Sequence, residues 1–144
     1  MGIDITTLEF ILFSQKYMNI SGINILSLGR QQIHIDQNDM NSLFKKYNLT
    51  HLIGRFNIYD YSETFFKTLF NTDLNVDSID NSHYEGATIV QNMNVPIKLS
   101  KKYQYIFDGG TIEHIFNAHY LLLFIVDNYL SKMRLSETLN FNFF

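Results

Sequence analysis

The residues best suited to chemistry gather in one short stretch, which reads Asp108, Gly109, Gly110, Thr111, Ile112, Glu113 and His114. A carboxylate accepts hydrogen bonds from ligand hydroxyls, and a histidine is suited to exchanging a proton near neutral pH. The two glycines allow the backbone to turn without the steric penalty of a Cβ atom. The stretch therefore predicts a turn that carries a ligand-binding acid and a candidate general base.

A predicted strand and a predicted helix must position this turn. Residues 103–107 form a short apolar run typical of a buried strand, and Thr111 stands where the N-cap of a following helix belongs. The apolar series that indicates this helix is Ile112, Ile115, Phe116, His119, Leu122, Leu123 and Val126. In open α/β sheets, ligands bind where strand carboxyl ends meet helix amino ends, so we expect a ligand crevice here.

Three further helices are predicted from capping residues that precede apolar side chains. Thr6 and Glu9 form a capping box, Asp36 is an N-cap, and Asp60 and Glu63 form a second capping box. The expected inward faces are Leu8, Ile11 and Leu12, then Met40, Leu43, Phe44 and Tyr47, then Phe65, Phe66, Leu69 and Phe70. The last face is interpreted as core, and residues 48–60 as a loop.

Strands are predicted over residues 23–28, 74–79, 87–90 and 103–107, with the first of them central. The second and third are either antiparallel or joined by a short crossover. The alternation of strands and helices favours an α/β fold, Rossmann-like and doubly wound, with a mostly parallel sheet. We expect one domain, residues 1–144, whose C-terminal strands are missing or incomplete, because residues 136–144 alternate like one strand at best.

Composition narrows the classes of function. The chain has 144 residues, 46% of them hydrophobic, and a net charge of −3, so disorder is excluded and binding to nucleic acid is not expected. There is no cysteine, and the five histidines share no metal-ligand spacing, so no metal site is predicted. The longest apolar run is too short for a membrane span, and no secretory signal is evident, which favours a cytoplasmic protein.

Four predicted strand ends carry polar residues or glycine, as a nucleoside site requires. An acid accepts both ribose hydroxyls, an amide meets the adenine amine, and glycine lets the backbone approach. The four ends are Leu28-Gly29-Arg30, Ile79-Asp80, Val90-Gln91-Asn92 and Phe107-Asp108-Gly109.

Residues 25–31, 76–80, 84–87 and 107–117 together resemble class I S-adenosylmethionine-dependent methyltransferases. The likeness covers roughly residues 20 to 130 and is greatest to the methyltransferase-like proteins found among surface-polysaccharide and related biosynthetic genes. The resemblance implies S-adenosylmethionine as cofactor and a small-molecule or glycan acceptor.

The resemblance also implies the site residues. For the cofactor they are Leu28, Gly29, Arg30, Asp80, Asn92, Met93, Asp108 and Gly109. The first three would lie under the methionine part, Asp80 would hold the ribose hydroxyls, and Asn92 with Met93 would adjoin the adenine. The last two would border the transferred methyl group. Glu113 and His114 would lie at the substrate entrance, as the catalytic pair.

Two departures from the family pattern leave another interpretation open. The family's first loop usually reads acid-x-Gly-x-Gly, whereas this chain has Ser27 and Gln31 at the acid and second glycine. After Ser131 the usual Gly-Gly turn and further strands do not follow, which indicates a truncated chain or a partner or oligomer that covers an exposed sheet edge. The alternative function is therefore an inactive Rossmann-like module, a scaffold or gene remnant. A nicotinamide enzyme is disfavoured because Gly-x-Gly-x-x-Gly is missing.

Overall fold

The structure, a computed structural model, describes residues 2–17, 24–70 and 75–136. Its main sheet has four strands in the order β5-β4-β2-β6, and every neighbouring pair is parallel. A second, two-stranded sheet pairs β1 with β3, also in parallel. The strands are β1 (Gly2–Ile3), β2 (Asn24–Leu28), β3 (Gln32–Ile33), β4 (Asn75–Asp80), β5 (Ile89–Val90) and β6 (Tyr105–Asp108).

Strand β2 is central, as the sequence predicts, and it is buried on both faces. Ile25, Leu26, Ser27 and Leu28 each have no exposed surface. Near-continuous apolar character is typical of a parallel strand covered from both sides. The side chain of Ser27 donates a hydrogen bond to the carbonyl oxygen of Gly29 at 2.9 Å, so the polar residue in this strand is paired.

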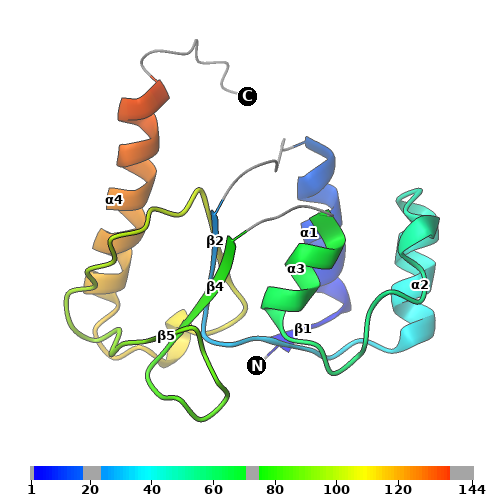
Figure 1. Cartoon of the computed structure of the whole chain (residues 1–144), viewed down its shortest axis with the longest axis horizontal. Helices are drawn as coiled ribbons and strands as arrows, with labels where there is room; N and C mark the ends of the chain where they lie inside the picture. Colours follow the sequence, from blue (N-terminus) through cyan, green and yellow to red (C-terminus); the bar gives the residue numbers. More distant parts are fainter. Residues whose placement is uncertain (1, 18–23, 71–74, 137–144) are drawn as a thin grey trace.

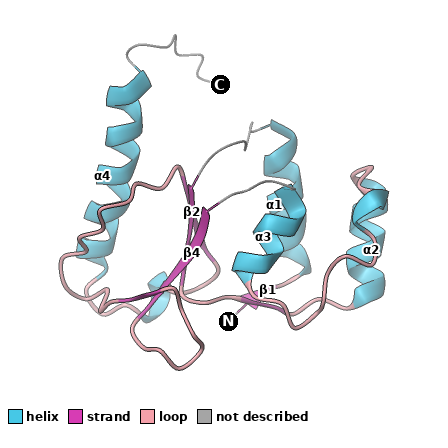
Figure 2. Cartoon of the chain, viewed as in Figure 1, coloured by secondary structure: helices cyan, strands magenta, loops and turns pink. Residues whose placement is uncertain are grey.

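Helices lie on both sides of the sheet: α4 on one side and α1, α2 and α3 on the other (Figures 1 and 2). Their bounds are α1 (Ile5–Tyr17), α2 (Gln37–Lys46), α3 (Ser62–Phe70) and α4 (Ala118–Ser136), with short 3₁₀ turns η1 (Thr50–Leu52) and η2 (Ile112–His114). The expected α/β fold with a largely parallel sheet is confirmed. Within the described ranges, no helix combines the length and apolar character that crossing a bilayer requires.

Two apolar clusters hold these layers together. Ile25 and Phe107 face the cluster on the side of α1 to α3, whereas Leu26 and Leu28 face the cluster that includes Leu121 of α4. The first cluster contains a chain of aromatic contacts, with centroid separations of 5.2 Å, 5.2 Å, 5.5 Å and 5.4 Å along Phe44, Phe56, Phe65, Phe66 and Phe107. The aromatic face predicted for the third helix is therefore core.

Strand β5 is short, but side-chain hydrogen bonds align it with β4. The hydroxyl of Thr88 donates to the carbonyl oxygen of Ser78 at 2.9 Å and accepts from the backbone N–H of Ser78 at 2.7 Å. The backbone N–H of Thr88 donates to the hydroxyl of Ser78 at 3.2 Å. These bonds close the base of loop 81–88. Strands β4 and β5 are parallel, so of the two arrangements that the sequence left open, the short crossover is correct and the antiparallel pairing is wrong.

Two of the three predicted capping arrangements are wrong in detail. Helix α1 is capped by Asp4, whose carboxylate accepts from the N–H of Thr7 at 2.7 Å, and the helix begins at Ile5. Asp36 caps α2 as expected, accepting from Asn38 at 2.8 Å. Asp60 instead accepts from Asn57 at 3.1 Å, inside the preceding turn. Local spacing identified the helices, but the choice between neighbouring acids depends on the tertiary fold.

The segment after β6 also differs from its prediction. Residues 112–114 form the turn η2, and α4 starts at Ala118, so the single helix expected from residue 112 is wrong. Ile115 is extended, and the backbone N–H of Asn117 donates to the side chain of Asn94 at 2.8 Å. This contact with a distant loop replaces the helical bonds that the apolar spacing favours. The strand-like pattern predicted at the C-terminus lies almost wholly outside the described residues.

Candidate functional site

The strand order creates a crevice at one end of the sheet. From β2 the chain moves to β4 and then β5 on one side, and later returns to β6 on the other side of β2. In open α/β sheets, ligands bind outside the carboxyl ends of the strands where the order reverses in this way. The register pairs Leu28 with both Ile79 and Asp108, so Gly29, Asp80 and Asp108 stand at the same edge of the sheet.

A cavity of about 330 Å³ lies at this edge, and we refer to it as the site cavity. Its walls come from the loops that follow β2, β4, β5 and β6. Its lining residues are Gly29, Arg30, Gln31, Asp80, Asn81, Glu85, Met93, Asn94, Thr111, His114 and Ile115. Pockets for small ligands in proteins usually have volumes from about 300 Å³ upward, so this cavity is of the size a small molecule requires.

The structure brings together half of the ten site residues expected from the resemblance. Those that line the site cavity are Gly29, Arg30, Asp80, Met93 and His114. Those that do not are Leu28, Asn92, Asp108, Gly109 and Glu113. Asn81 and Asn94 line it without having been singled out from the sequence. The sequence could have indicated both, because each follows within four residues of a strand end that carries a polar group.

The residues that miss the cavity have structural surroundings of their own. Leu28 is fully buried in the cluster beside α4. The side chain of Asn92 accepts from the backbone N–H of Asn94 at 2.9 Å and so stabilises a turn. Asp108 accepts from the N–H groups of Thr111 at 2.9 Å and Ile112 at 3.3 Å, which caps η2. These side chains shape the loops around the site cavity and do not line it.

Asp80 is the acid of the cavity wall, and its carboxylate is weakly engaged. One oxygen accepts from the backbone N–H of Arg30 at 3.4 Å and the other from Ser82 at 3.3 Å. Both contacts are longer than a typical hydrogen bond of about 2.9 Å. Because an ionised carboxylate has about four acceptor positions, Asp80 retains capacity for two ligand hydroxyls.

The guanidinium of Arg30 connects the loop after β2 to the loop after β4. It stacks on the ring of Tyr61, with 3.9 Å between its central carbon and the ring centroid. Its Nε lies 3.2 Å from the carboxylate of Glu63, and its Nη1 donates to the carbonyl oxygen of Glu85. The same Glu63 oxygen accepts from the hydroxyl of Ser78. The charge of Arg30 is therefore offset by Glu63.

Gln31 fills the gap between the ends of β2 and β6. Its side-chain Nε2 donates to the carbonyl oxygen of Leu28 at 2.9 Å and to the hydroxyl of Thr111 at 3.0 Å, and that hydroxyl donates to Leu28 at 2.7 Å. The residue is 1% exposed. Its carboxamide oxygen is buried without a hydrogen-bond partner. A Cβ atom placed on Gly109 would lie 2.9 Å from that oxygen, so an alanine there would require the Gln31 side chain to shift.

Glu113 and His114 form an exposed pair at the edge of the site cavity. His114 Nε2 lies 3.4 Å from a Glu113 carboxylate oxygen, and both side chains are more than half exposed. His114 lines the site cavity, so its imidazole can accept a proton from a group bound there, whereas Glu113 lies outside the cavity.

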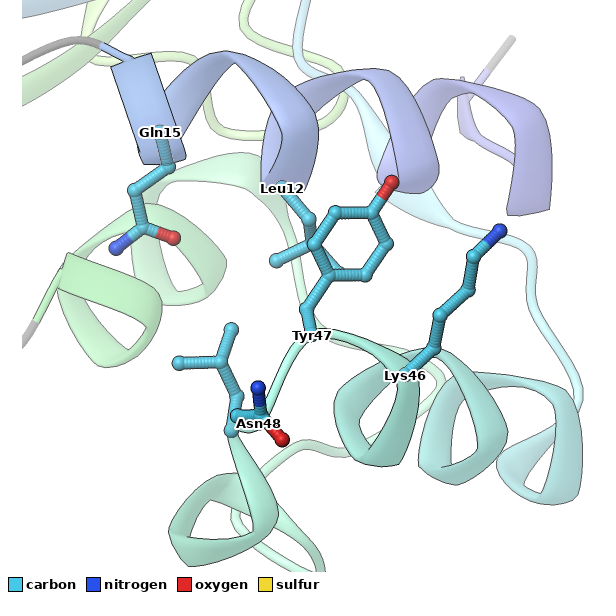
Figure 3. A pocket seen from close by; sticks show the side chains of 6 residues that line it. Leu12, Gln15, Lys46, Tyr47 and Asn48 are labelled. Atoms are coloured by element: carbon cyan, nitrogen blue, oxygen red, sulfur yellow. The ribbon is translucent and has the colours of Figure 1, made fainter.

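A second cavity lies between α1 and α2, far from the strand ends, and we refer to it as the helix groove (Figure 3). Its volume is about 520 Å³, and it is lined by Leu12, Gln15, Lys46, Tyr47, Asn48 and Leu49. Lys46 pairs with Glu9, and this contact lowers the pKa of Glu9 and raises that of Lys46. Among the described residues, neither an acid nor a glycine lines the helix groove, and a nucleoside site needs both.

No protein-family model, curated protein or solved structure matches this chain. Among the described residues, no three histidine, aspartate or glutamate side chains gather closely enough to hold a metal ion.

Proposed function

We propose that this chain binds S-adenosylmethionine in the site cavity and is a methyltransferase domain that acts on a small-molecule or glycan acceptor. The observation that carries the proposal is the convergence of Gly29, Asp80 and Met93 on one cavity at the carboxyl edge of a parallel sheet. Helices on both faces and the central position of β2 support a Rossmann-like, doubly wound arrangement for the domain.

The residues of the site cavity fit the cofactor in chemical character. Asp80 has acceptor capacity for ribose hydroxyls, and Met93, which is 5% exposed, offers an apolar contact for a flat base. Gly29 lines the cavity with a φ of +69°, a left-handed backbone conformation that favours glycine. When bound, S-adenosylmethionine supplies an electrophilic methyl group for transfer to the acceptor.

Proximity and proton removal are the contributions we assign to the protein itself. The walls hold the acceptor beside the cofactor, which replaces a bimolecular encounter by a positioned one. His114 accepts the proton that a hydroxyl or amine acceptor loses on methylation, and Glu113 lies 3.4 Å from its Nε2 at the edge of the cavity. Asp108 keeps η2, and with it His114, in place through its two backbone hydrogen bonds.

Calorimetric titration with S-adenosylhomocysteine tests this proposal. We expect saturable binding by the unchanged chain and a loss of affinity of at least about tenfold in Asp80→Asn, because one charged acceptor is removed. The control is Asp39→Asn, which makes the same change on an exposed residue in the first turn of α2 and should leave binding unchanged. Equal affinity in Asp80→Asn would contradict the assignment of Asp80.

The second candidate is a Rossmann-like module without catalytic activity. The observation that favours it is Gln31, whose side chain occupies space at the strand ends that a glycine would leave open. This candidate predicts neither heat nor a thermal shift with S-adenosylhomocysteine. That result would replace the methyltransferase proposal by a partner-binding role.

A further inference from the structure

The strand order gives a bound nucleoside a direction across the site cavity. Met93 follows β5, Asp80 ends β4, and Gly29 follows β2, so these residues lie along the edge in that order. Neighbouring strands are roughly 4.8 Å apart, so β5 to β2 spans about 10 Å. With the base on Met93 and the ribose on Asp80, the substituent on the 5′ carbon points toward β2 and β6. This direction rests on the proposed function.

Gln31 and Thr111 occupy the end of the cavity toward which that substituent points. Both line the site cavity and both are buried, at 1% and 6% exposure. A Cβ atom on Gly29 would lie 2.4 Å from the Thr111 hydroxyl and 3.0 Å from Gln31 Nε2. There is thus no free space between the ends of β2 and β6 while the Gln31 side chain keeps this position.

Only the Nε2 group of the Gln31 carboxamide makes hydrogen bonds that hold the side chain in place. Nε2 donates twice, to Leu28 and Thr111, whereas Oε1 is buried and has no donor. The opposite amide orientation would set Oε1 against the Leu28 carbonyl oxygen, so the orientation described is the better one. A buried acceptor without a donor is destabilising, which makes this side-chain position comparatively easy to leave.

We propose that Gln31 is a specificity-determining residue that closes the part of the site for the 5′ substituent. In the resting protein, nucleosides with a short 5′ group fit without rearrangement. A ligand with an amino-acid tail requires the Gln31 side chain to turn away from Leu28 and Thr111. The site therefore discriminates by the length of the 5′ substituent.

The test compares two ligands that share a nucleoside and a 5′ sulfur atom. S-adenosylhomocysteine carries the amino-acid tail, and 5′-methylthioadenosine replaces it by a methyl group. We expect the unchanged chain to bind methylthioadenosine more tightly. In Gln31→Gly, calorimetry should show S-adenosylhomocysteine gaining about tenfold in affinity, whereas methylthioadenosine changes by less than about twofold.

The matched control is Gln32→Gly, which deletes the same kind of side chain from the next residue. The Gln32 side chain donates to the carbonyl oxygen of Tyr59 and does not line the site cavity. It should leave the affinity ratio of the two ligands unchanged.

Thr111→Val is the second variant if Gln31→Gly fails to fold. It removes one acceptor of Gln31 while keeping the side-chain shape, and should shift the ratio in the same direction by a smaller factor.

The outcomes separate the inference from the function on which it depends. An unchanged ratio in both variants, with methylthioadenosine still bound, would overturn the role of Gln31 and leave the proposed function intact. Binding of neither ligand by any variant would overturn both.

Discussion

The site cavity and the helix groove are built in different ways, although the groove is the larger of the two. Four loops that follow parallel strands form the site cavity. Buried hydrogen bonds of Gln31 and Thr111 join the loops after β2 and β6, and Arg30 joins the loops after β2 and β4. Helices α1 and α2 and the turn after α2 form the groove, and its ion pair between Lys46 and Glu9 is exposed. A large cavity volume alone therefore does not indicate a ligand site. A better indication is a set of polar groups that come from several loops and are held in place by contacts with one another.

The largest effect that this comparison predicts is at Gly29, with Gly54 as its control. Both have positive φ, +69° and +79°, but a Cβ on Gly29 would meet Thr111 at 2.4 Å, whereas nothing lies within 4 Å at Gly54. Left-handed backbone costs an alanine about 1–2 kcal/mol, and displacing Thr111 adds about 1 kcal/mol for each hydrogen bond it loses. Urea unfolding should show Gly29→Ala losing about 3 kcal/mol and Gly54→Ala about 1 kcal/mol. Equal losses would show that the site loops are not closely packed.

Glu63 provides the next test, with Glu113 as its control. Glu63→Ala leaves Arg30 and Ser78 without their shared acceptor, and should lower the free energy of unfolding by about 2 kcal/mol. The partly exposed guanidinium keeps this below the full cost of breaking a buried ion pair. Glu113→Ala removes an acid from an exposed pair with His114 and should leave the unfolding curve unchanged. Similar losses in both variants would contradict the distinction between buried and exposed contacts.

Helix α1, one wall of the groove, depends on a single capping acid. Asp4→Ala should cost about 1 kcal/mol, the usual loss for an N-cap. The hydrogen bond from Thr7 lowers the pKa of Asp4 below its ordinary value of 3.8. Its contribution is therefore complete above that value and is lost as the pH falls through the lower folded pKa. Thermal unfolding of Asp4→Asn, which keeps the cap without the charge, should show a shallower decline in that acid range.

The smallest effect is predicted at the rim of the groove. Lys46→Met removes the partner of Glu9, but both side chains are exposed and screened by water. We expect no measurable shift in the unfolding midpoint and no change in nucleoside affinity. A change in affinity would mean that the groove and the site cavity are coupled, which the comparison does not predict.

Residues whose partners are close in the sequence were predictable. The apolar run of β2 indicated a central strand, Asp36 marked the start of α2, and Asp80 stood where a strand ended. The sequence alone could not show that Thr111 donates to Leu28, 83 positions away, or that Glu63 meets Arg30, 33 positions away. Such pairs have no periodicity, so the contact of Gln31 with Thr111 became visible only once the strands were placed.

The hydrogen bonds between Ser78 and Thr88 have a consequence for how this domain can be altered. They close the base of loop 81–88, and Arg30 holds its far side through Glu85. Because the entropy of closing a loop rises only slowly with its length, residues 82–84 are a segment that can be lengthened or exchanged at little cost in stability. Other loop sequences could be grafted there while the sheet beneath remains as it is.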